Sequence, residues 1–102
     1  MVDKVGLGIA EIIGDKRDDI LRLAAQHKAY NVRVFGSVAR GEARPDSDVD
    51  FVVNFQSDAR LGNMLELWDS LKELLGREID IVEEVALKGR FLVNVKRDAI
   101  AL

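Results

Sequence analysis

Apolar residues follow two different periods along the chain, and these predict helices and strands in alternation. Residues 48–55 alternate with a period of two, which is typical of a strand with one buried face. Residues 59–75 repeat at helical spacing, and Gly76 is expected to end that helix. The predicted elements are helix Val2–Ile13, helix Asp15–Ala29, strand Val32–Phe35, helical turn Ser37–Gly41, loop Glu42–Ser47, strand Asp48–Phe55, helix Ala59–Leu75, strand Glu78–Val82, and a helix within Ala86–Leu102, where FLVNV leaves a strand open.

Helix boundaries and buried positions follow from the same pattern. Asp15 and Asp58 precede helical periodicity and are expected to cap the helices that follow them. No repeat, linker or low-complexity segment divides the chain, which predicts a single domain over residues 1–102 with residues 1–14 as an N-terminal extension. The stripe expected to be buried in the long helix is Leu61, Met64, Leu65, Trp68, Leu71 and Leu75.

Composition narrows the class of protein. The chain has 102 residues, 48% of them hydrophobic and 32% charged, which is typical of a soluble globular domain. The net charge of −3 disfavours general binding to nucleic acid, so nucleic acid is not expected as a partner. Because there is no cysteine and no apolar run long enough for a signal peptide or a membrane span, we expect a cytoplasmic protein without membrane contact.

The stretch FGSVARGEARPDSDVD contains the candidate chemistry. Asp48 and Asp50 share one strand face, and Asp80 is an acid within the apolar strand of IDIV. Carboxylates so close repel unless a cation lies between them, and Mg²⁺ favours a few carboxylates together with phosphate oxygens. The three aspartates therefore predict a divalent metal site, with Glu78 as the alternative third ligand.

A glycine turn supplies the second half of this expected site. Gly36 permits close backbone approach, and the helical turn that follows points N–H groups outward towards an anion. The Ser37 hydroxyl can add a hydrogen bond, and Arg40 and Arg44 are near enough in sequence to contact phosphates, although solvent exposure explains these arginines equally well. A divalent metal site next to an anion-binding turn fits phosphoryl transfer from a nucleoside triphosphate.

This stretch resembles the signature of the nucleotidyltransferase superfamily that includes DNA polymerase beta, and it is most similar to the minimal nucleotidyltransferases. GREIDIV and EEVALKGR extend the resemblance to the end of the chain. It implies an α/β (α+β) fold with a short mixed sheet, helices mainly on one face and the metal site at the other. It also implies that Gly36 and Ser37 hold the triphosphate of ATP, while Asp48, Asp50 and Asp80 bind Mg²⁺ or Mn²⁺ and Asp80 is a candidate base.

The resemblance also implies a biological role. Minimal nucleotidyltransferases pair with HEPN ribonuclease toxins, and in characterised pairs they act as antitoxins by moving AMP from ATP to a tyrosine of the toxin. Two alternatives stay open: a nucleotide-binding protein that inhibits a HEPN partner by contact, and a transferase that acts on RNA or a small molecule. Both homo-oligomers and hetero-oligomers are compatible with the sequence.

Overall fold

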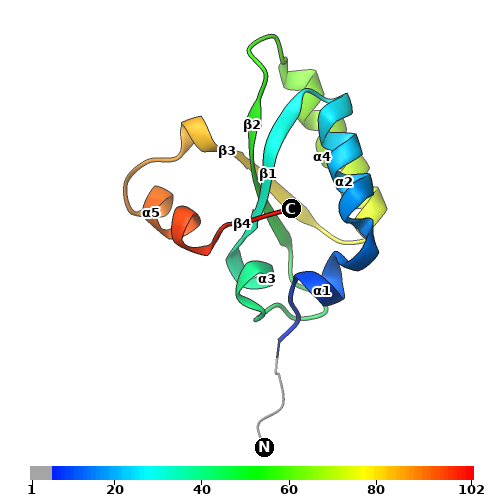
Figure 1. Cartoon of the computed structure of the whole chain (residues 1–102), viewed down its shortest axis with the longest axis vertical. Coiled ribbons are helices and arrows are strands. Elements are labelled where there is room, and N and C mark those ends of the chain that lie inside the picture. Colours follow the sequence, from blue (N-terminus) through cyan, green and yellow to red (C-terminus); the bar gives the residue numbers. More distant parts are fainter. Residues whose placement is uncertain (1–5) are drawn as a thin grey trace, which may run out of the picture.

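Four strands form a single mixed sheet in the order β3-β2-β1-β4 (Figure 1). The structure is a computed structural model and describes residues 6–102. Antiparallel β1 (Ala29–Phe35) and β2 (Val49–Phe55) form the centre, and β3 (Ile79–Glu83) runs parallel to β2 at one edge. A parallel neighbour requires a crossover, and the 15-residue helix α4 (Leu61–Leu75) provides it.

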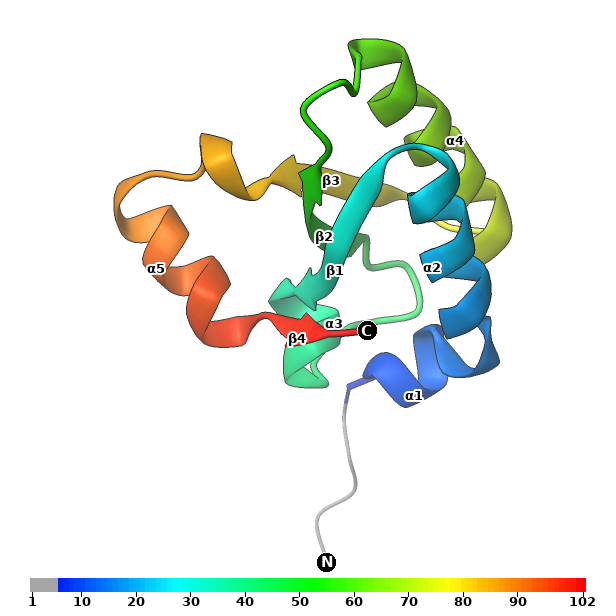
Figure 2. The same cartoon turned by 45° about the horizontal axis from the view of Figure 1, so that its top comes forward.

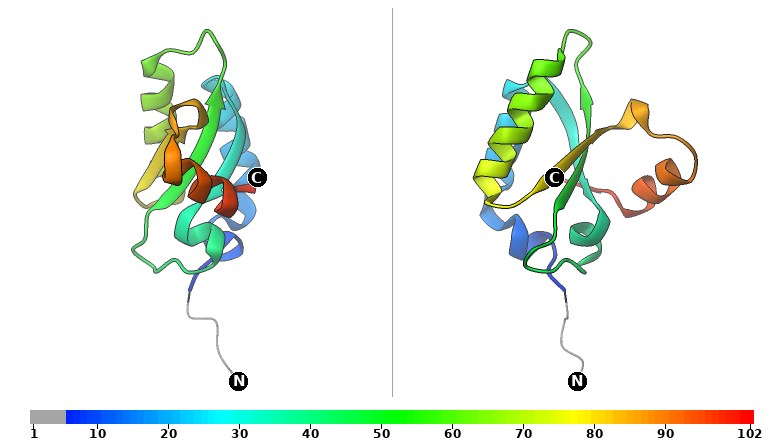
Figure 3. Two further views of the ribbon diagram at one scale, coloured as in Figure 1. Left: turned by 90° about the vertical axis from the view of Figure 1, so that its left-hand side faces the viewer. Right: turned by 180° about the vertical axis from the view of Figure 1, so that it is seen from behind.

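Helices α2 (Arg17–Gln26) and α4 cover one face of the sheet (Figures 1 and 3). Strand alternation places Val34 and Phe51 on this face, where they pack with Ile20 and Leu67 in the main core. The opposite face is covered only in part, by α5 (Gly89–Asp98), through a smaller cluster of Phe35, Val52, Leu87 and Val95. The predicted α/β fold, a short mixed sheet with helices mainly on one face, is confirmed.

The N-terminal segment packs against the domain. Leu7 pairs with Ala43 through two backbone hydrogen bonds of 2.7 and 3.0 Å, and Ile12 and Ile13 are buried in the core. The helix expected at Val2–Ile13 is only α1 (Ile9–Ile12), and residues 2–5 of that prediction lie outside the described residues. Figure 2 shows α1 beside the base of α2, where it continues the helical layer.

Both predicted helix caps were wrong. Asp15 lies in a 3-10 turn (Gly14–Lys16), and α2 begins only at Arg17. Helix α4 is capped at Arg60, whose N–H donates to the Asn63 side chain at 2.8 Å. Asp58 instead accepts a 2.6 Å hydrogen bond from the Lys28 ammonium, which ties the β2–α4 loop to the α2–β1 turn.

The predicted buried stripe of α4 is wrong at its N-terminal end. Leu61 and Leu65 are 72% and 54% exposed, whereas Leu71 is buried together with Leu67, which was not predicted. Gly76 does end the helix, in a left-handed conformation at φ +65° that glycine adopts without strain.

The C-terminal segment forms a helix and then a strand. The predicted helix is α5, so the alternative of a strand at FLVNV is wrong. After the 3-10 turn Glu84–Ala86 and α5, the chain forms β4 (Ile100–Ala101), which was not predicted. This two-residue strand pairs with Arg33 and Val34 of β1 and returns the chain to the sheet directly after the C-terminal end of α5.

Candidate functional site

Two of the predicted acids face one another across the parallel pair of strands. Asp50 of β2 and Asp80 of β3 are partners in register, and alternation places both on the partly covered face of the sheet. Asp48 lies just before β2 and is exposed, whereas Asp50 and Asp80 are half-buried. The structure thus brings the acidic residues together at the end of the sheet where β2 begins.

The electrostatics of Asp50 show how closely the three acids interact. Burial, followed by the negative charges of Asp80 and Asp48, raises the pKa of Asp50 to about 6, while the positive charge of Arg40 opposes the rise. A carboxylate in this position gains from any cation that enters. As the side chains stand, no group of three or more histidine or acidic residues within residues 6–102 is arranged to hold a metal ion. Metal ligation by Asp48, Asp50 and Asp80 stays a prediction.

The turn between β1 and α3 (Gly36–Arg40) lies directly against Asp50. Gly36 has φ +73°, in the left-handed region that favours glycine, and a Cβ at this position would collide with the Asp50 carboxylate oxygen Oδ2. The backbone therefore approaches the acidic residues as closely as glycine allows. Because the first N–H groups of a helix have no partner within the helix, those around Ser37 are suited to an anion, and their contact with phosphate stays a prediction.

We predict that Gly36→Ala impairs nucleotide binding more than it impairs folding. The new methyl group must displace the Asp50 carboxylate, and the left-handed backbone adds strain on the order of 1 kcal/mol. Calorimetric titration with Mg-ATP and thermal melting separate the two effects. Ser37→Ala is the matched control at the neighbouring position and should be milder, since it leaves the backbone N–H groups in place. Wild-type ATP affinity in Gly36→Ala would contradict the assignment of this turn.

Arg40, predicted to bind phosphate, is engaged by two carboxylates. Its guanidinium donates to Glu42 at 3.1 Å and to Asp98, at the end of α5, at 2.9 Å. Both hydrogen bonds raise the pKa of Arg40, and the one to Glu42 has the larger effect. Asp98 lies 58 residues away in sequence, and no local pattern pointed to it. The pair joins α3 to α5 beside the acidic residues, and a contact between Arg40 and phosphate stays a prediction.

Short polar contacts fix the loop that carries Asp48. The Ser47 hydroxyl accepts a hydrogen bond from the Arg44 N–H at 2.8 Å, and the Arg77 guanidinium donates to the Ser47 carbonyl at 3.1 Å. Glu78, the alternative third ligand, precedes β3, is exposed and pairs with Lys72 at 3.0 Å. This ion pair favours Asp80 over Glu78 as the third acid.

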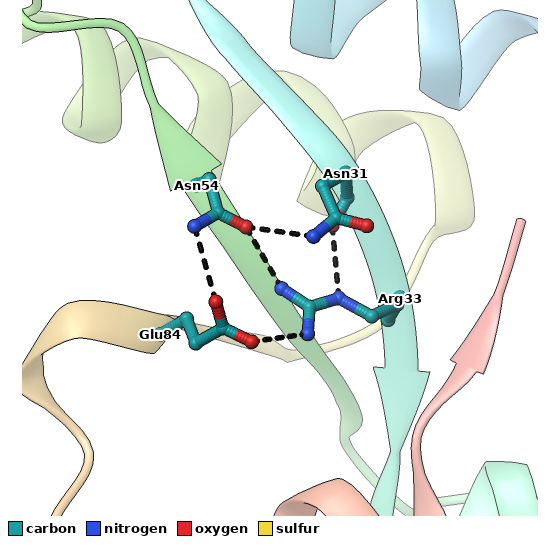
Figure 4. A network of polar contacts seen from close by, with 4 residues as sticks. All are labelled: Asn31, Arg33, Asn54 and Glu84. Carbon is teal, nitrogen blue, oxygen red and sulfur yellow. Dashed lines mark hydrogen bonds and ion pairs between the residues drawn. The ribbon is translucent and has the colours of Figure 1, made fainter.

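A second polar group on the same face was missed by the sequence analysis (Figure 4). The Arg33 guanidinium donates to Glu84 at 2.6 Å and to the Asn54 side-chain oxygen at 2.9 Å, and Asn31 donates to that same oxygen at 3.0 Å. The hydrogen bond from Arg33 is the main reason that the pKa of Glu84 is lowered. This network lies along β2 from Asp50, on the far side of Val52, and joins the segment after β3 to the sheet.

Comparison with known proteins agrees with this geometry. The nucleotidyltransferase domain family matches residues 18–102. A protein of Thermococcus cleftensis named protein adenylyltransferase MntA is 41% identical over 69 residues, which cover 68% of this chain and 70% of that protein. A solved structure described as a candidate minimal nucleotidyltransferase superposes with a TM-score of 0.78 at 48% identity, covering 86% of this chain and 90% of that one.

A more distant structure shares the fold. A toxin–antitoxin crystallised with AMP-PNP superposes with a TM-score of 0.70 at 21% identity, covering 82% of this chain and 69% of that chain. The chain belongs to the nucleotidyltransferase domain family, and the predictions of this family and of a nucleotidyltransferase enzyme are confirmed. Within the part of the chain that the structure describes, no helix is both long and apolar enough to cross a membrane.

Proposed function

We propose that this chain transfers AMP from ATP to a tyrosine hydroxyl of a HEPN ribonuclease toxin and thereby acts as its antitoxin. The observation that carries the chemistry is the in-register pair of Asp50 and Asp80 beside the Gly36 turn, where a Cβ would collide with the Asp50 carboxylate. The protein acceptor is supported by the name of the Thermococcus relative, and the toxin by the distant toxin–antitoxin structure. The HEPN identity of that toxin rests on the resemblance of the sequence.

In the proposed reaction the acceptor oxygen attacks the α-phosphorus of ATP. A new P–O bond forms, the bond to the β-phosphate oxygen breaks, and pyrophosphate leaves on the opposite side. The proton of the acceptor hydroxyl passes to a carboxylate, for which Asp80 is the candidate. The Gly36–Ser37 turn orients the triphosphate, so that the α-phosphorus is presented to the acceptor in line with the leaving group.

The donor set fits a hard divalent cation. Asp48, Asp50 and Asp80 offer only carboxylate oxygens, and burial together with the negative charges of Asp80 and Asp48 raises the pKa of Asp50, so that a cation would favour its ionised form. These three residues would hold Mg²⁺ or Mn²⁺, which would neutralise the triphosphate and the developing charge on the leaving group. The residues then act by holding oxygen atoms in place and by accepting the proton.

The intact mass of the partner tests this function. The chain is incubated with Mg-ATP and any HEPN protein found encoded beside its gene, and we expect this partner to gain the mass of one or more AMP groups. The tyrosines of the partner are replaced with phenylalanine one at a time to locate the acceptor. Only replacement of the modified tyrosine should abolish the gain in mass.

The same assay separates the alternatives. Neutralisation of the ribonuclease by Asp50→Asn with no added mass would replace transfer with inhibition by contact. Mass added to an RNA 3′ end or a small molecule, with none on the partner, would assign another acceptor. A partner that gains AMP yet keeps full ribonuclease activity would contradict the antitoxin role while leaving the transferase chemistry in place.

A further inference from the structure

Helix α5 lies on the face of the sheet that α2 and α4 leave open (Figures 1 and 3). Val95 anchors it by packing with Phe35 and Val52, and both of these border Asp50: Phe35 is its partner on β1, and Val52 is the next residue along the same face. Asp98 fixes the end of the helix through Arg40. The α5 side chains that lie on the side of Phe35 and Arg40 are therefore within reach of a nucleotide whose phosphates lie at the Gly36 turn.

Phe91 places an aromatic ring at this position. Its ring meets that of Phe35 edge to face, with centroids 6.2 Å apart and an interplanar angle of 74°. Phe35 directly precedes Gly36, so the two rings lie next to the turn that is expected to bind the phosphates. Phe91 is nevertheless 51% exposed. Core packing therefore uses only part of this ring, and a large apolar surface is left beside a site for a charged ligand.

The direction of Phe91 follows from helical spacing. Phe91, Asn94 and Asp98 are three and seven residues apart and share one stripe of α5. Asp98 pairs with α3, which fixes the side of the helix on which this stripe lies. By contrast, Val93 belongs to another stripe and is 64% exposed.

Asn94 lies between the aromatic ring and the ion pair. It is half-buried, and its side chain makes no hydrogen bond or ion pair with any of residues 6–102. An amide offers one donor group and one acceptor in one plane. Adenine presents the complementary pair at N7 and the N6 amino group, whereas the same edge of guanine presents two acceptors.

From this arrangement we propose that Phe91 and Asn94 form a subsite for the base of the nucleotide and select adenine. Phe91 stacks on the base, and the Asn94 amide pairs with its N6–N7 edge. The inference rests on the proposed function, since the phosphates at Gly36 set the position of the base. It assigns α5 a role in choosing the substrate, whereas the acidic residues and the glycine turn bind any nucleoside triphosphate alike.

Calorimetric titration of the full chain with Mg-ATP, Mg-GTP and Mg-tripolyphosphate tests the subsite. Phe91→Ala should weaken ATP binding about tenfold, since stacking of one base on an aromatic side chain contributes on this order. Tripolyphosphate has no base, so its affinity should not change. Asn94→Ala should reduce the preference for ATP over GTP by about tenfold.

Matched variants guard against indirect effects. Val93→Ala removes a similar apolar surface from another stripe of α5 and should bind ATP like the wild type. Phe91→Leu keeps an apolar contact with Phe35 but lacks the π face, so it should resemble Phe91→Ala in ATP affinity while melting like the wild type.

The subsite and the proposed function fail in different ways. Equal ATP affinity in Phe91→Ala and Val93→Ala, or an unchanged ATP-to-GTP ratio in Asn94→Ala, would overturn the base subsite while leaving the transferase chemistry in place. If wild-type protein binds neither ATP nor tripolyphosphate in the presence of Mg²⁺, the proposed function fails and the subsite fails with it.

Discussion

Asp50→Asn is expected to lower the rate of AMP transfer on the order of a thousandfold while leaving the chain folded. The substitution keeps the shape of the side chain but removes the most central of the three negative charges, which lies between Asp80 and the Gly36 turn. Binding of the partner protein should persist, since the change alters no exposed apolar surface. The measurement is the intact mass of the partner over time with Mg-ATP.

The same substitution should stabilise the metal-free protein, by an amount that depends on pH. The pKa of Asp50 is raised to about 6 in the folded state, so its ionisation opposes folding. This penalty is absent below the ordinary pKa of about 4 and complete above about 6. After allowance for solvent screening of a half-exposed group, it amounts to roughly 1–2 kcal/mol. Asp50→Asn should therefore melt several degrees above the wild type at pH 7.5, by about 5 °C, and the difference should vanish near pH 4.

Asp46→Asn is the matched control. It removes an equal charge four residues earlier, at an exposed position in the loop before β2, and should change neither transfer nor the melting temperature. Asp48→Asn should also lower the rate of transfer strongly, with a smaller effect on melting because Asp48 is exposed. A large loss of stability in Asp50→Asn would show that the Asp50 carboxylate has a structural partner, and transfer at the wild-type rate would remove it from the active site.

The sequence predicted the centre of the molecule better than its borders. Strand β2 was predictable because alternation between Val49 and Phe55 leaves only one choice of buried face, and that choice also fixed the direction of Asp50. Gly36 and Gly76 were predictable as turn residues because both adopt left-handed conformations that glycine reaches without strain. In these places local stereochemistry and the final fold agree.

The contacts that were missed join distant parts of the chain. Arg33 meets Glu84 across 51 residues, and Arg40 meets Asp98 across 58, so no spacing rule could link them. Strand β4 has only two residues and forms because α5 returns the chain to β1. The apolar period in α4 was real, but burial was assigned to Leu61 and Leu65 because periodicity does not show how far along a helix the core extends.

Binding of ATP should require a divalent cation. Burial, together with the negative charges of Asp80 and Asp48, already raises the pKa of Asp50, and a triphosphate brings further negative charge to the same place. Calorimetric titration with ATP in excess chelator should show affinity at least about a hundredfold weaker than with Mg²⁺ or Mn²⁺. Equal affinity in the two conditions would contradict the metal site, because a cluster of acids would then hold ATP without charge compensation.

The metal should also bind in competition with a proton. Because the pKa of Asp50 is about 6, this carboxyl is largely protonated at pH 5 and must lose its proton before it can act as a ligand. The affinity for Mn²⁺, measured in the absence of nucleotide by electron paramagnetic resonance, should therefore fall about tenfold per pH unit below 6 and level off above 7. In Asp50→Asn this pH dependence should disappear along with most of the affinity, whereas Asp46→Asn should keep both. A Mn²⁺ affinity that is constant between pH 5 and 7 in the wild type would place the metal away from Asp50.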